Sequence, residues 1–394
     1  MKVKVGVIFG GETVEHEISI ITAVQAMKYI DPEKYEIVPI YISKDRIWYT
    51  GKMLMDIEVY KDFEHLKRYA KKVAFYKKNG TFVLQTVGMF KRVVEELDIM
   101  FPIMHGNNTE DGSIQGYLET VGIPYVGSKV LASAIGQDKV IMKQVMSSIN
   151  LPIVPYTWFY DINYYDENEK ILNEIKELGY PVIVKPATLG SSVGITVVKE
   201  ESKIDQAVRE AIKYDVKIIV EKVIENLVEV NCSVLGNYKY QEASVIEEVI
   251  STEEFLTYTD KYIGKSKGDT TKGMVATNRV IPARIDNKLY KEIQELAKET
   301  FKVMNLSGVA RIDFLIDNKK KKAYVNEPNT IPGSLSFYLW EKTNKPYKKL
   351  LDEMLSIAIK DFKTKSKKIY SFDTNILSNF NGLKGGKGLK GIKK

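Results

Sequence analysis

The stretch ARIDFLIDNKKKKAYVNEPNTIPGSLSFYLW, residues 310–340, contains two apolar runs on either side of a lysine-rich turn. Apolar residues that alternate with polar ones are typical of β-strands, so the stretch predicts a hairpin. If the hairpin is centred on Lys320, Asp313 lies opposite Glu327. Pro328 is a poor residue inside a strand, so we expect the second strand to end there and the chain to turn toward a ligand.

One face of this hairpin is polar. The same register places Arg311 opposite Asn329, and residues two apart in a strand share a face. Opposed carboxylates such as Asp313 and Glu327 repel each other. A Mg²⁺ ion would relieve the repulsion, because it binds carboxylate and amide oxygens together with substrate phosphates. On these residues alone, a magnesium site and an acidic patch neutralised by Arg311 or the lysines are equally open.

The composition of the 394-residue chain is that of an ordinary globular protein, with 44% hydrophobic and 28% charged residues. At about 100–200 residues per domain, the length predicts two or three domains. The sequence contains no apolar run near the roughly 18 residues of a membrane helix, and its N-terminus lacks the pattern of a signal peptide. We therefore expect a cytoplasmic enzyme with no membrane partner.

Neither cysteine nor histidine indicates a metal site. The single cysteine, Cys232, lies in an apolar run and is expected to be a buried thiol. The three histidines, His16, His65 and His105, lack the spacing of paired metal ligands.

The formal net charge of +7 comes mainly from the C-terminal tail. Residues 376–394 contain five lysines and no acidic residue. The rest of the chain is therefore nearly neutral, unlike a dedicated nucleic-acid-binding domain, so nucleic acid is not an expected partner. A tail rich in Gly and Lys is expected to be disordered and solvated. Contact of the tail with a nucleic acid or a membrane is the alternative.

Residues 1–137 show apolar strands that alternate with helices, including a helix from about Glu15. This order is typical of an α/β domain with a largely parallel sheet. In such sheets ligands bind at the carboxyl ends of the strands. Residues 10–15 and 105–107 are therefore expected at the ligand-binding edge.

Two further units follow. Residues 138–223 begin with a predicted helix at 138–148 and continue with strands and a second helix, whereas residues 224–375 hold a long helix at 286–304 and the hairpin. Residues 258–283 are rich in Gly, Thr and Lys and are long for an ordinary connection. A mobile lid and a plain surface loop are equally open there.

Residues 182–198, VIVKPATLGSSVGITVV, combine a strand, Lys185 and a loop with two glycines and two serines. Backbone N–H groups and hydroxyls in such a loop can bind phosphate oxygens, and the lysine adds a positive charge. The loop is not a Walker motif. The GKS at residues 264–266 has Thr259 in place of the first motif glycine. A simple Gly-Ser hairpin turn is the alternative.

Two other loops are polar. The first, GGETVEHEIS at residues 10–19, follows the first strand but lacks GxGxxG, which disfavours a hydride-transfer enzyme. Its Glu15 would stabilise the helix dipole in the simplest interpretation. The second, HGNNTEDGSIQGYLE at residues 105–119, brings His105 near residues 110–112, for which a turn and helix cap is the alternative.

Taken in order, these segments resemble the D-alanine–D-alanine ligases of the ATP-grasp superfamily. The matching segments run from Val5 to about Trp340 and are GGETVEHEIS, HGNNTEDGSIQGYLE, Asp138-Lys139, PVIVKPATLGSSVG, VEKVI, DKY at 260–262, RIDF and NEPNTIPG. The resemblance implies a three-domain α/β ATP-grasp fold that grips ATP between its second and third domains. The implied divisions are an N-terminal parallel-sheet substrate domain at 1–137, a central subdomain at 138–223, a C-terminal subdomain at 224–375 with lid 258–283 and metal hairpin 310–333, and the tail.

The resemblance also implies an activity. The chain would be an ATP-dependent, ADP-forming ligase that joins two D-alanines through an acyl phosphate and supplies peptidoglycan precursors. The implied ATP-binding residues are Lys139, Lys185, Ser191, Ser192, Glu221, Lys222, Val223, Glu229 and Lys261, with the phosphates at Lys139 and Lys185. The implied ligands of two Mg²⁺ ions, which Mn²⁺ could replace, are Asp313, Glu327 and Asn329.

Roles in substrate binding and catalysis are implied in the same way. Glu15 would hold the ammonium of the first amino acid near His105, and Ser334 and Leu335 would receive the carboxylate of the second. Ser191 and Tyr262 would link to Glu15 and close the lid. Arg311 and the backbone N–H of Gly333 would stabilise the oxyanion. The implied partners are ATP, D-amino acids and a second copy of the chain in a homodimer.

The sequence departs from this family after Gly333. Family members usually have a few more residues before the Ser-Leu pair, whereas Ser334 follows Gly333 at once here. A ligase with another second substrate (D-serine, D-lactate or another amino acid) is therefore the alternative. An inactive homologue that only binds ligands is disfavoured, because the metal and phosphate residues Lys185 and Asp313 are retained.

Overall fold

The computed structural model describes residues 2–190, 193–250 and 278–371. Several predicted features lie outside these ranges. They are Ser191, Ser192, Lys261, Tyr262, most of the lid at 258–283 and the tail at 376–394.

The hairpin at residues 310–333 forms the predicted pairs, but it is not symmetric about Lys320. Pairs near the turn, such as Asp317 with Lys322, are one residue off the predicted register, and a β-bulge between Asp313 and Phe314 produces the predicted alignment beyond it. Strand β15 (Gly308–Asp317) pairs antiparallel with β16 (Lys322–Asn329), with Asp313 opposite Glu327 and Arg311 opposite Asn329. The strand ends at Asn329, one residue later than expected, so Pro328 still pairs with Ile312 inside the ladder. β16 is the last strand of its sheet, and a proline is tolerated on an edge strand, where a ladder N–H is not required.

The hairpin belongs to a five-stranded antiparallel sheet with the order β14-β13-β12-β15-β16. Its other strands are β12 (Leu227–Gly236), β13 (Gln241–Ile250) and β14 (Asn278–Val280). Helix α10 (Asn287–Val303) covers one face of the sheet and buries Leu289, Ile293 and Phe301 against it. α10 begins where the carboxylate of Asp286 accepts two backbone N–H groups, which is a standard helix cap.

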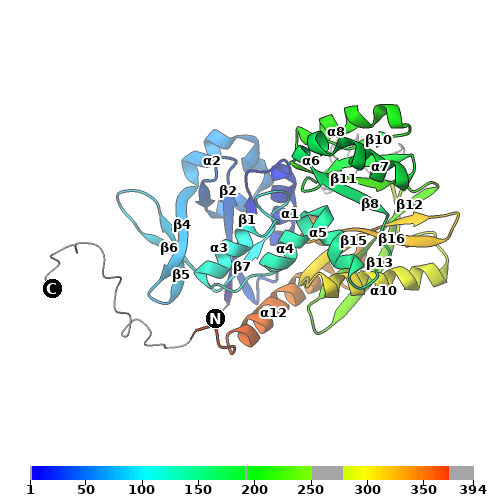
Figure 1. Ribbon diagram of the computed structural model, residues 1–394. Helices are drawn as coiled ribbons and strands as arrows, with labels where there is room; N and C mark the ends of the chain where they lie inside the picture. The colour runs from blue at the N-terminus through cyan, green and yellow to red at the C-terminus, as the bar shows by residue number, and fades with distance from the viewer. Residues whose placement is uncertain (1, 191–192, 251–277, 372–394) are drawn as a thin grey trace, which may run out of the picture.

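The central part of the chain, residues 138–223, contains a four-stranded antiparallel sheet with the order β10-β9-β11-β8. Its elements are α5 (Lys139–Ser147), β8 (Tyr156–Tyr160), α6 (Asp161–Asp166), α7 (Asn168–Leu178), β9 (Val182–Pro186), β10 (Thr196–Val198), η3 (Glu201–Lys203), α8 (Ile204–Ile212) and β11 (Lys217–Lys222). Helices α7 and α8 bury Ile175 and Val208 in the core of this sheet. The two helices and the sheet form the green lobe of Figure 1.

The N-terminal part contains a seven-stranded sheet with the order β6-β5-β4-β3-β2-β1-β7. The strands are β1 (Val3–Gly10), β2 (Tyr35–Ile42), β3 (Trp48–Thr50), β4 (Lys71–Lys78), β5 (Thr81–Thr86), β6 (Val93–Leu97) and β7 (Ile99–Pro102). The helices are α1 (His16–Tyr29), η1 (Lys52–Met55), η2 (Ile57–Lys61), α2 (Phe63–Tyr69), α3 (Ser113–Val121) and α4 (Val130–Gln137). Strand β1 pairs parallel with both β2 and β7.

The sheet is less parallel than the sequence predicts. Strands β3, β4, β5 and β6 extend it antiparallel. β4 and β5 are joined by Asn79-Gly80, both with positive φ, which is the turn that a two-residue hairpin requires. A short turn of this kind forces the next strand to run back, so this half of the sheet cannot be parallel.

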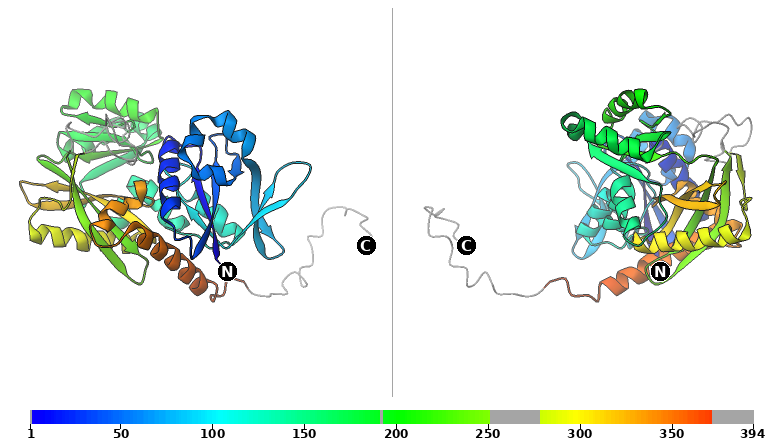
Figure 2. Two further views of the ribbon diagram at one scale, coloured as in Figure 1. Left: turned by 180° about the vertical axis from the view of Figure 1, so that it is seen from behind. Right: turned by 45° about the vertical axis from the view of Figure 1, so that its right-hand side comes forward.

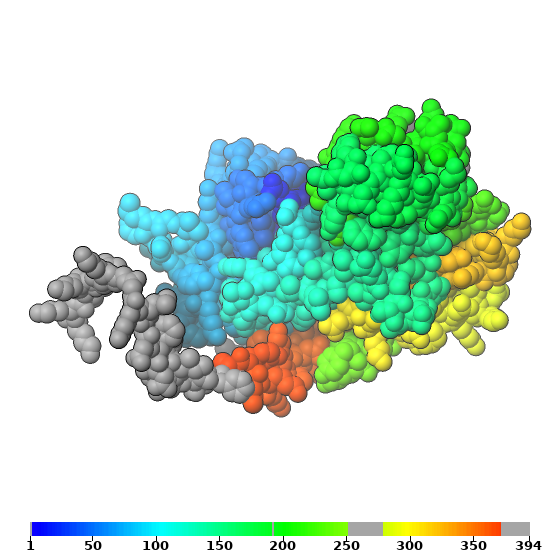
Figure 3. Space-filling view, in the orientation of Figure 1, coloured from blue at the N-terminus to red at the C-terminus, as the bar shows by residue number. Residues whose placement is uncertain are grey.

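The last helices of the described chain pack against its N-terminal part. After η4 (Gly333–Ser336) and α11 (Phe337–Glu341), helix α12 (Tyr347–Lys365) packs Leu351 and Leu355 into the core that contains Val5 and Phe9 of β1. Figure 2 shows α12 running along the lower side of the molecule. In the space-filling view, orange-red α12 lies between the N-terminal part and the yellow-green C-terminal sheet (Figure 3). Among the described residues, no helix is long and apolar enough to cross a membrane.

Candidate active site

A cleft of about 380 Å³ lies where the N-terminal part meets the two smaller sheets. The residues predicted for ATP, metal and substrate that line it are Glu15, His105, Lys139, Lys185, Glu221, Lys222, Val223, Glu229, Arg311, Asp313, Glu327, Asn329 and Gly333. These residues come from α5, β9, β11, β12, β15, β16, η4 and loops of the N-terminal part. The fold therefore gathers residues that are more than 300 positions apart in the sequence into one cavity.

A buried ion pair cluster lies at the side of the cleft formed by the central sheet. Lys185 Nζ is 2.8 Å from Glu221 Oε2, and Lys143 Nζ is 3.3 Å from Glu221 Oε1. Burial alone would raise the pKa of Glu221, but the ammonium groups of Lys143 and Lys185 lower it to about 2. Glu221 is thus a fixed negative charge between two lysines, and Lys185 reaches the cleft from this cluster.

Lys139 is placed by a well-defined helix start. The side chain of Asp138 accepts hydrogen bonds from the backbone N–H groups of Val140 and Ile141, and its other oxygen pairs with Lys217 Nζ at 2.5 Å. The Lys139 ammonium donates to Leu189 O at 2.6 Å and lies 3.9 Å from Glu327 Oε2. Lys139 therefore faces both the Gly-Ser loop and the hairpin carboxylates.

Asp313 is held by two partners. Arg311 donates to both of its carboxylate oxygens, at 2.6 and 2.7 Å, and Asn329 Nδ2 donates to Oδ2 at 3.0 Å. Burial disfavours the charged guanidinium, but Asp313 holds the pKa of Arg311 well above its usual range. The sequence left two interpretations of the hairpin open, a magnesium site and an acidic patch neutralised by Arg311. Both involve the carboxylate of Asp313, because Arg311 neutralises the same group that a cation would bind.

The donor set of the hairpin suits Mg²⁺ bound with phosphates. Two opposed carboxylates and one amide offer oxygen ligands, and ionised carboxylate oxygens can each accept more than one partner. Within residues 2–190, 193–250 and 278–371, no group of three or more His, Cys, Asp and Glu side chains could hold a metal ion on its own. A cation at Asp313 and Glu327 would therefore need oxygen ligands from a substrate as well.

A second charged cluster lies beside Arg311. Glu247 is fully buried and accepts hydrogen bonds from Asn231 Nδ2 at 3.0 Å and from the Tyr338 hydroxyl at 2.9 Å. Arg279 Nη1 lies 3.3 Å from the other carboxylate oxygen, and its guanidinium carbon is 4.7 Å from the centre of the Tyr338 ring. Arg279 lines the cleft, so this cluster adds a fixed guanidinium that the sequence did not indicate.

The N-terminal part contributes carboxylates and a histidine. Glu15 lies at the N-cap of α1, and its Oε2 is 3.1 Å from where a Cβ on Gly106 would be. His105 Nδ1 lies 3.8 Å from Glu110 Oε2. Burial raises the pKa of Glu110 to about 7, although His105 opposes this shift. Two carboxylates, Glu15 and Glu110, thus face a site suited to an ammonium group.

The glycine pair that precedes Glu15 has a structural cause. Gly10 and Gly11 have φ of +90° and +99°. A Cβ on Gly10 would lie 2.2 Å from Ile42 O, and one on Gly11 would lie 2.7 Å from the Thr109 side chain. The pair makes the tight turn that brings Glu15 to the carboxyl end of β1, as predicted for this edge.

The chain after Gly333 forms an unusual turn. Ser334, Leu335 and Ser336 all have φ near +50°, a left-handed conformation that costs non-glycine residues free energy. Ser334 and Leu335 are 2% and 1% exposed, and the Leu335 side chain joins the N-terminal core. Neither lines the cleft, although Ser334 N–H donates to Thr22 Oγ1, which also hydrogen-bonds His105.

Sequence reasoning missed Lys143, Arg279, Asn231 and Glu247, and gave Glu110 no role beyond a turn. A signal existed for Lys143. It lies three residues from Val140 and Met146, so it occupies the buried face of α5, where an unpaired lysine is not expected. No comparable local signal marks Glu247, whose partners come from three other elements.

Comparisons with known proteins agree with this architecture. The family pattern described as D-ala D-ala ligase N-terminus matches residues 4–128, and that described as D-ala D-ala ligase C-terminus matches residues 145–356. A D-alanine--D-alanine ligase from Thermosipho melanesiensis is 42% identical over 373 residues, covering 95% of this chain and 98% of that protein. The enzyme of the same name from Caldicellulosiruptor bescii is 38% identical, with 94% and 99% covered.

Solved structures of D-alanine ligases are also similar to this chain. The D-alanine-D-alanine ligase from Coxiella burnetii superimposes with a TM-score of 0.79 and 29% identity, covering 93% of this chain and 96% of that one. The VanG D-Ala:D-Ser ligase from Enterococcus faecalis gives a TM-score of 0.77, also at 29% identity, with 91% and 100% covered.

Proposed function

The chain belongs to the D-alanine–D-alanine ligase family, and on this basis we propose that it joins two D-alanines in an ATP-dependent, ADP-forming reaction. One observation carries the proposal. Lys139 and Lys185, the hairpin carboxylates and Glu15 line a single cleft. Such a cleft has cations for phosphates and carboxylates for an ammonium group.

The reaction that fits this cleft begins with a phosphoryl transfer. A carboxylate is a poor electrophile, so the first D-alanine attacks the terminal phosphorus of ATP through its carboxylate, and ADP leaves. Lys139 and Lys185 bind the phosphates and neutralise charge during the transfer. Mg²⁺ bound at Asp313, Glu327 and Asn329 would neutralise further phosphate charge.

The second step forms the peptide bond. The amine of the second D-alanine attacks the acyl carbon of the acyl phosphate, a proton is lost from nitrogen, and inorganic phosphate leaves. Arg311 and the backbone N–H of Gly333 would stabilise the oxyanion, and one such donor contributes about 3–4 kcal/mol in known enzymes. Glu15 holds the first ammonium in place throughout.

We further propose that Glu221, Lys222 and Val223 bind the adenine and Glu229 the ribose, because these residues line the cleft along β11 and β12. Ser191, Ser192, Lys261 and Tyr262 would complete the site from segments outside the described residues. The domain division at residues 137 and 223, a homodimer and a cytoplasmic location for peptidoglycan precursor synthesis belong to the same proposal.

A second candidate function is a D-alanine–D-serine ligase. One solved structure of that activity is as similar in sequence as the D-alanine–D-alanine ligase structure, at 29% identity. The left-handed turn at Ser334–Ser336 lies in the region proposed for the second substrate. D-Lactate or another amino acid would fit the same alternative.

The test is ADP release from Mg-ATP with a panel of D- and L-amino acids and D-lactate, with products identified by mass. D-Alanine alone should give D-alanyl-D-alanine. ADP release only with a mixed pair, such as D-alanine with D-serine, would favour the second candidate. ADP release with none of the panel would contradict both.

A further inference from the structure

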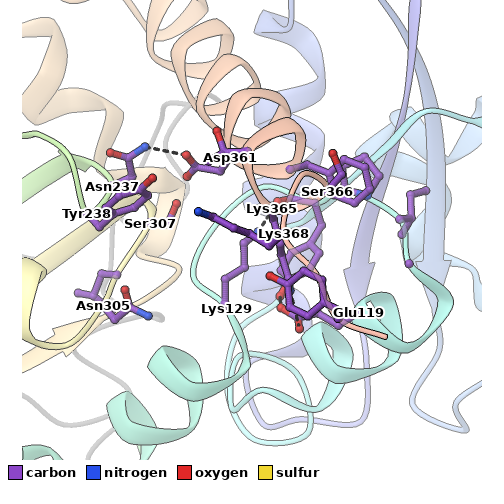
Figure 4. Close-up of a pocket in the computed structure, with 18 residues that line it drawn as sticks. Glu119, Lys129, Asn237, Tyr238, Asn305, Ser307, Asp361, Lys365, Ser366 and Lys368 are labelled. Atoms are coloured by element: carbon purple, nitrogen blue, oxygen red, sulfur yellow. Dashed lines mark hydrogen bonds and ion pairs between the residues drawn. The ribbon is translucent and has the colours of Figure 1, made fainter. Parts of the chain in front are cut away.

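A second cavity, of about 460 Å³, shares no lining residue with the cleft. Four segments surround it: residues 119–129 from the end of α3 to the start of α4, the β12–β13 turn, residues 305–307 before β15, and the C-terminal end of α12 with the residues that follow it. Figure 4 shows Asn237 and Asp361 pointing toward each other there, with Glu119, Lys129 and Lys365 around the same space. The cavity thus lies where the N-terminal part, the C-terminal sheet and α12 meet.

The walls of this cavity are largely apolar. Ile123 and Leu306 are buried in its floor, and the rings of Tyr125, Tyr238 and Phe362 line its sides. Apolar walls with a few polar groups are typical of sites for small molecules, in which the apolar body contributes affinity and the polar groups give orientation.

Lys129 is the polar group that points to a ligand class. Its Nζ donates to Tyr125 O at 2.8 Å and lies 3.6 Å from the centre of the Tyr125 ring. Among the residues that the structure describes, no carboxylate forms an ion pair with this ammonium. Burial lowers the pKa of Lys129 to about 8, and the more distant carboxylates of Glu119 and Asp361 oppose this shift. A partly buried ammonium that forms no close ion pair can take an incoming carboxylate as its partner.

The acidic residues of the cavity are engaged elsewhere. Glu119 accepts a hydrogen bond from the Tyr125 hydroxyl at 2.9 Å and pairs with Lys365 at 3.1 Å. Asp361 accepts from Asn237 Nδ2 at 2.9 Å. Both carboxylates thus have their own donors, so Lys129 keeps hydrogen-bonding capacity for an incoming acid.

We propose that this cavity binds a small carboxylate with an apolar body, that its acid group contacts Lys129, and that the bound molecule changes ATP binding in the cleft. The first physical link is α4. The helix starts directly after Lys129 and ends at Gln137, whose side chain donates to Thr188 O at 2.7 Å. Lys139 of the cleft follows two residues later.

The second link is β15. Ser307 N–H donates to Ser128 Oγ at 3.3 Å, and a Cβ on Gly308 would lie 3.1 Å from the Gly127 Cα. The segment that carries Lys129 is therefore packed directly on the start of β15. The same strand carries Arg311 and Asp313 into the cleft. A small shift of residues 127–129 would reach the cleft through both rigid elements.

Binding is tested with the full chain and a defined probe, 3-phenylpropionate, by isothermal titration calorimetry. The neutral amide 3-phenylpropionamide is the matched ligand control. The protein variants are Lys129→Met and, as a matched control, Lys363→Met, since Lys363 is exposed on α12 and outside the cavity. We expect the acid to bind the wild type and K363M equally, and the amide to bind the wild type at least tenfold more weakly. Binding of the acid to K129M should also be at least tenfold weaker.

The effect on the cleft is measured as the Kd of ATP without amino acid, with and without saturating probe. We expect a several-fold change in the wild type, an equal reciprocal change in the Kd of the probe, and neither change in K129M, because coupling between two sites is reciprocal. Equal affinity of wild type for acid and amide would overturn the proposal. So would unchanged binding of the acid to K129M, or an ATP Kd that the probe does not alter. The acid–amide comparison uses only the wild type, so it decides the matter even if K129M does not fold.

Discussion

Arg311 and Asp313 are joined by two parallel hydrogen bonds, from Nε to Oδ1 at 2.6 Å and from Nη2 to Oδ2 at 2.7 Å. The two residues are neighbours on one face of β15, and Asn329 Nδ2 adds a third hydrogen bond to Asp313 Oδ2. The bidentate contact fixes the plane of the guanidinium. Asp313 thus has two proposed tasks, to orient the oxyanion donor Arg311 and to supply an oxygen to Mg²⁺.

Arg311→Lys should lower kcat by about 10²–10³, because lysine keeps the charge but cannot form the paired contact that orients the donor. The measurement is kcat from ADP release at saturating ATP and D-alanine, with the fold checked by circular dichroism and thermal unfolding.

The chain supplies a matched control for this change. Arg284 makes the same two-pronged contact with Glu248, at 3.0 and 2.6 Å, but at an exposed site outside the cleft. Arg284→Lys should leave kcat within about twofold, as surface pairs contribute little. Equal losses in both variants would show that the R311K effect is structural and would contradict the role given to Arg311.

Glu327→Gln should raise the Mg²⁺ concentration needed for half-maximal activity by about tenfold or more, because an amide is a weaker ligand for a hard cation than a carboxylate. The glutamine keeps the size of the side chain opposite Asp313. A second readout without turnover is the rise in Tm that Mg²⁺ produces in the presence of ADP, which should shrink in the variant.

Glu292→Gln, at an exposed position of α10, is the control and should leave the Mg²⁺ dependence unchanged. If the E327Q enzyme had the Mg²⁺ dependence of the wild type, the hairpin would not be the metal site. The opposed carboxylates would then be an acidic patch neutralised by Arg311 and Lys139.

Features of the site that depend on residues close together in the sequence could be predicted, whereas features that join distant segments could not. The pairing of Asp313 with Glu327 was predicted from a hairpin centred on Lys320 and was confirmed, but a β-bulge beside Asp313, which the sequence pattern did not predict, produces this alignment. The antiparallel half of the N-terminal sheet was missed, although Asn79-Gly80 is a strong local hairpin signal.

Other features required the tertiary structure. The three partners of Glu247 come from β12, β14 and α11, and no local pattern brings these together. The left-handed turn at Ser334–Ser336 contradicts local preference, because these residues disfavour positive φ. Burial of Leu335 in the core stabilises this conformation.

Lys143→Met should raise the KM for ATP by about tenfold with a smaller effect on kcat. In the wild type, Lys143 balances the buried charge of Glu221, so Lys185 is available to a phosphate. Without Lys143, the carboxylate of Glu221 has Lys185 as its remaining cation, and the phosphate must compete for it. The measurement is KM and kcat for ATP at saturating D-alanine.

Lys176→Met is the matched control, since Lys176 pairs with Glu201 at 3.2 Å on the surface of the same subdomain. This variant should keep the KM of the wild type. A K143M enzyme with unchanged KM but a lower Tm would mean that Lys143 serves only stability, and that Lys185 does not depend on it for phosphate binding.

Glu110→Gln should remove a pH dependence from the use of D-alanine. The pKa of Glu110 is raised to about 7 by burial, so the carboxyl is neutral below that pH and ionised above it. Ionisation adds a second negative charge beside Glu15 and favours an incoming ammonium group. In the wild type, the affinity for the first D-alanine, measured as its Kd with Mg-ADP present and no turnover, should therefore rise about fivefold between pH 6 and 8, which corresponds to about 1 kcal/mol of charge interaction.

In E110Q this rise should disappear, because a glutamine does not titrate, while the KM for ATP should stay within about twofold. Glu12→Gln is the control from the loop that carries Glu15, where the carboxylate is exposed and paired with Arg46 at 2.5 Å. It should keep the full rise. A rise that persists in E110Q would assign the titration to another group and leave Glu15 as the sole carboxylate proposed to hold the ammonium of the first substrate.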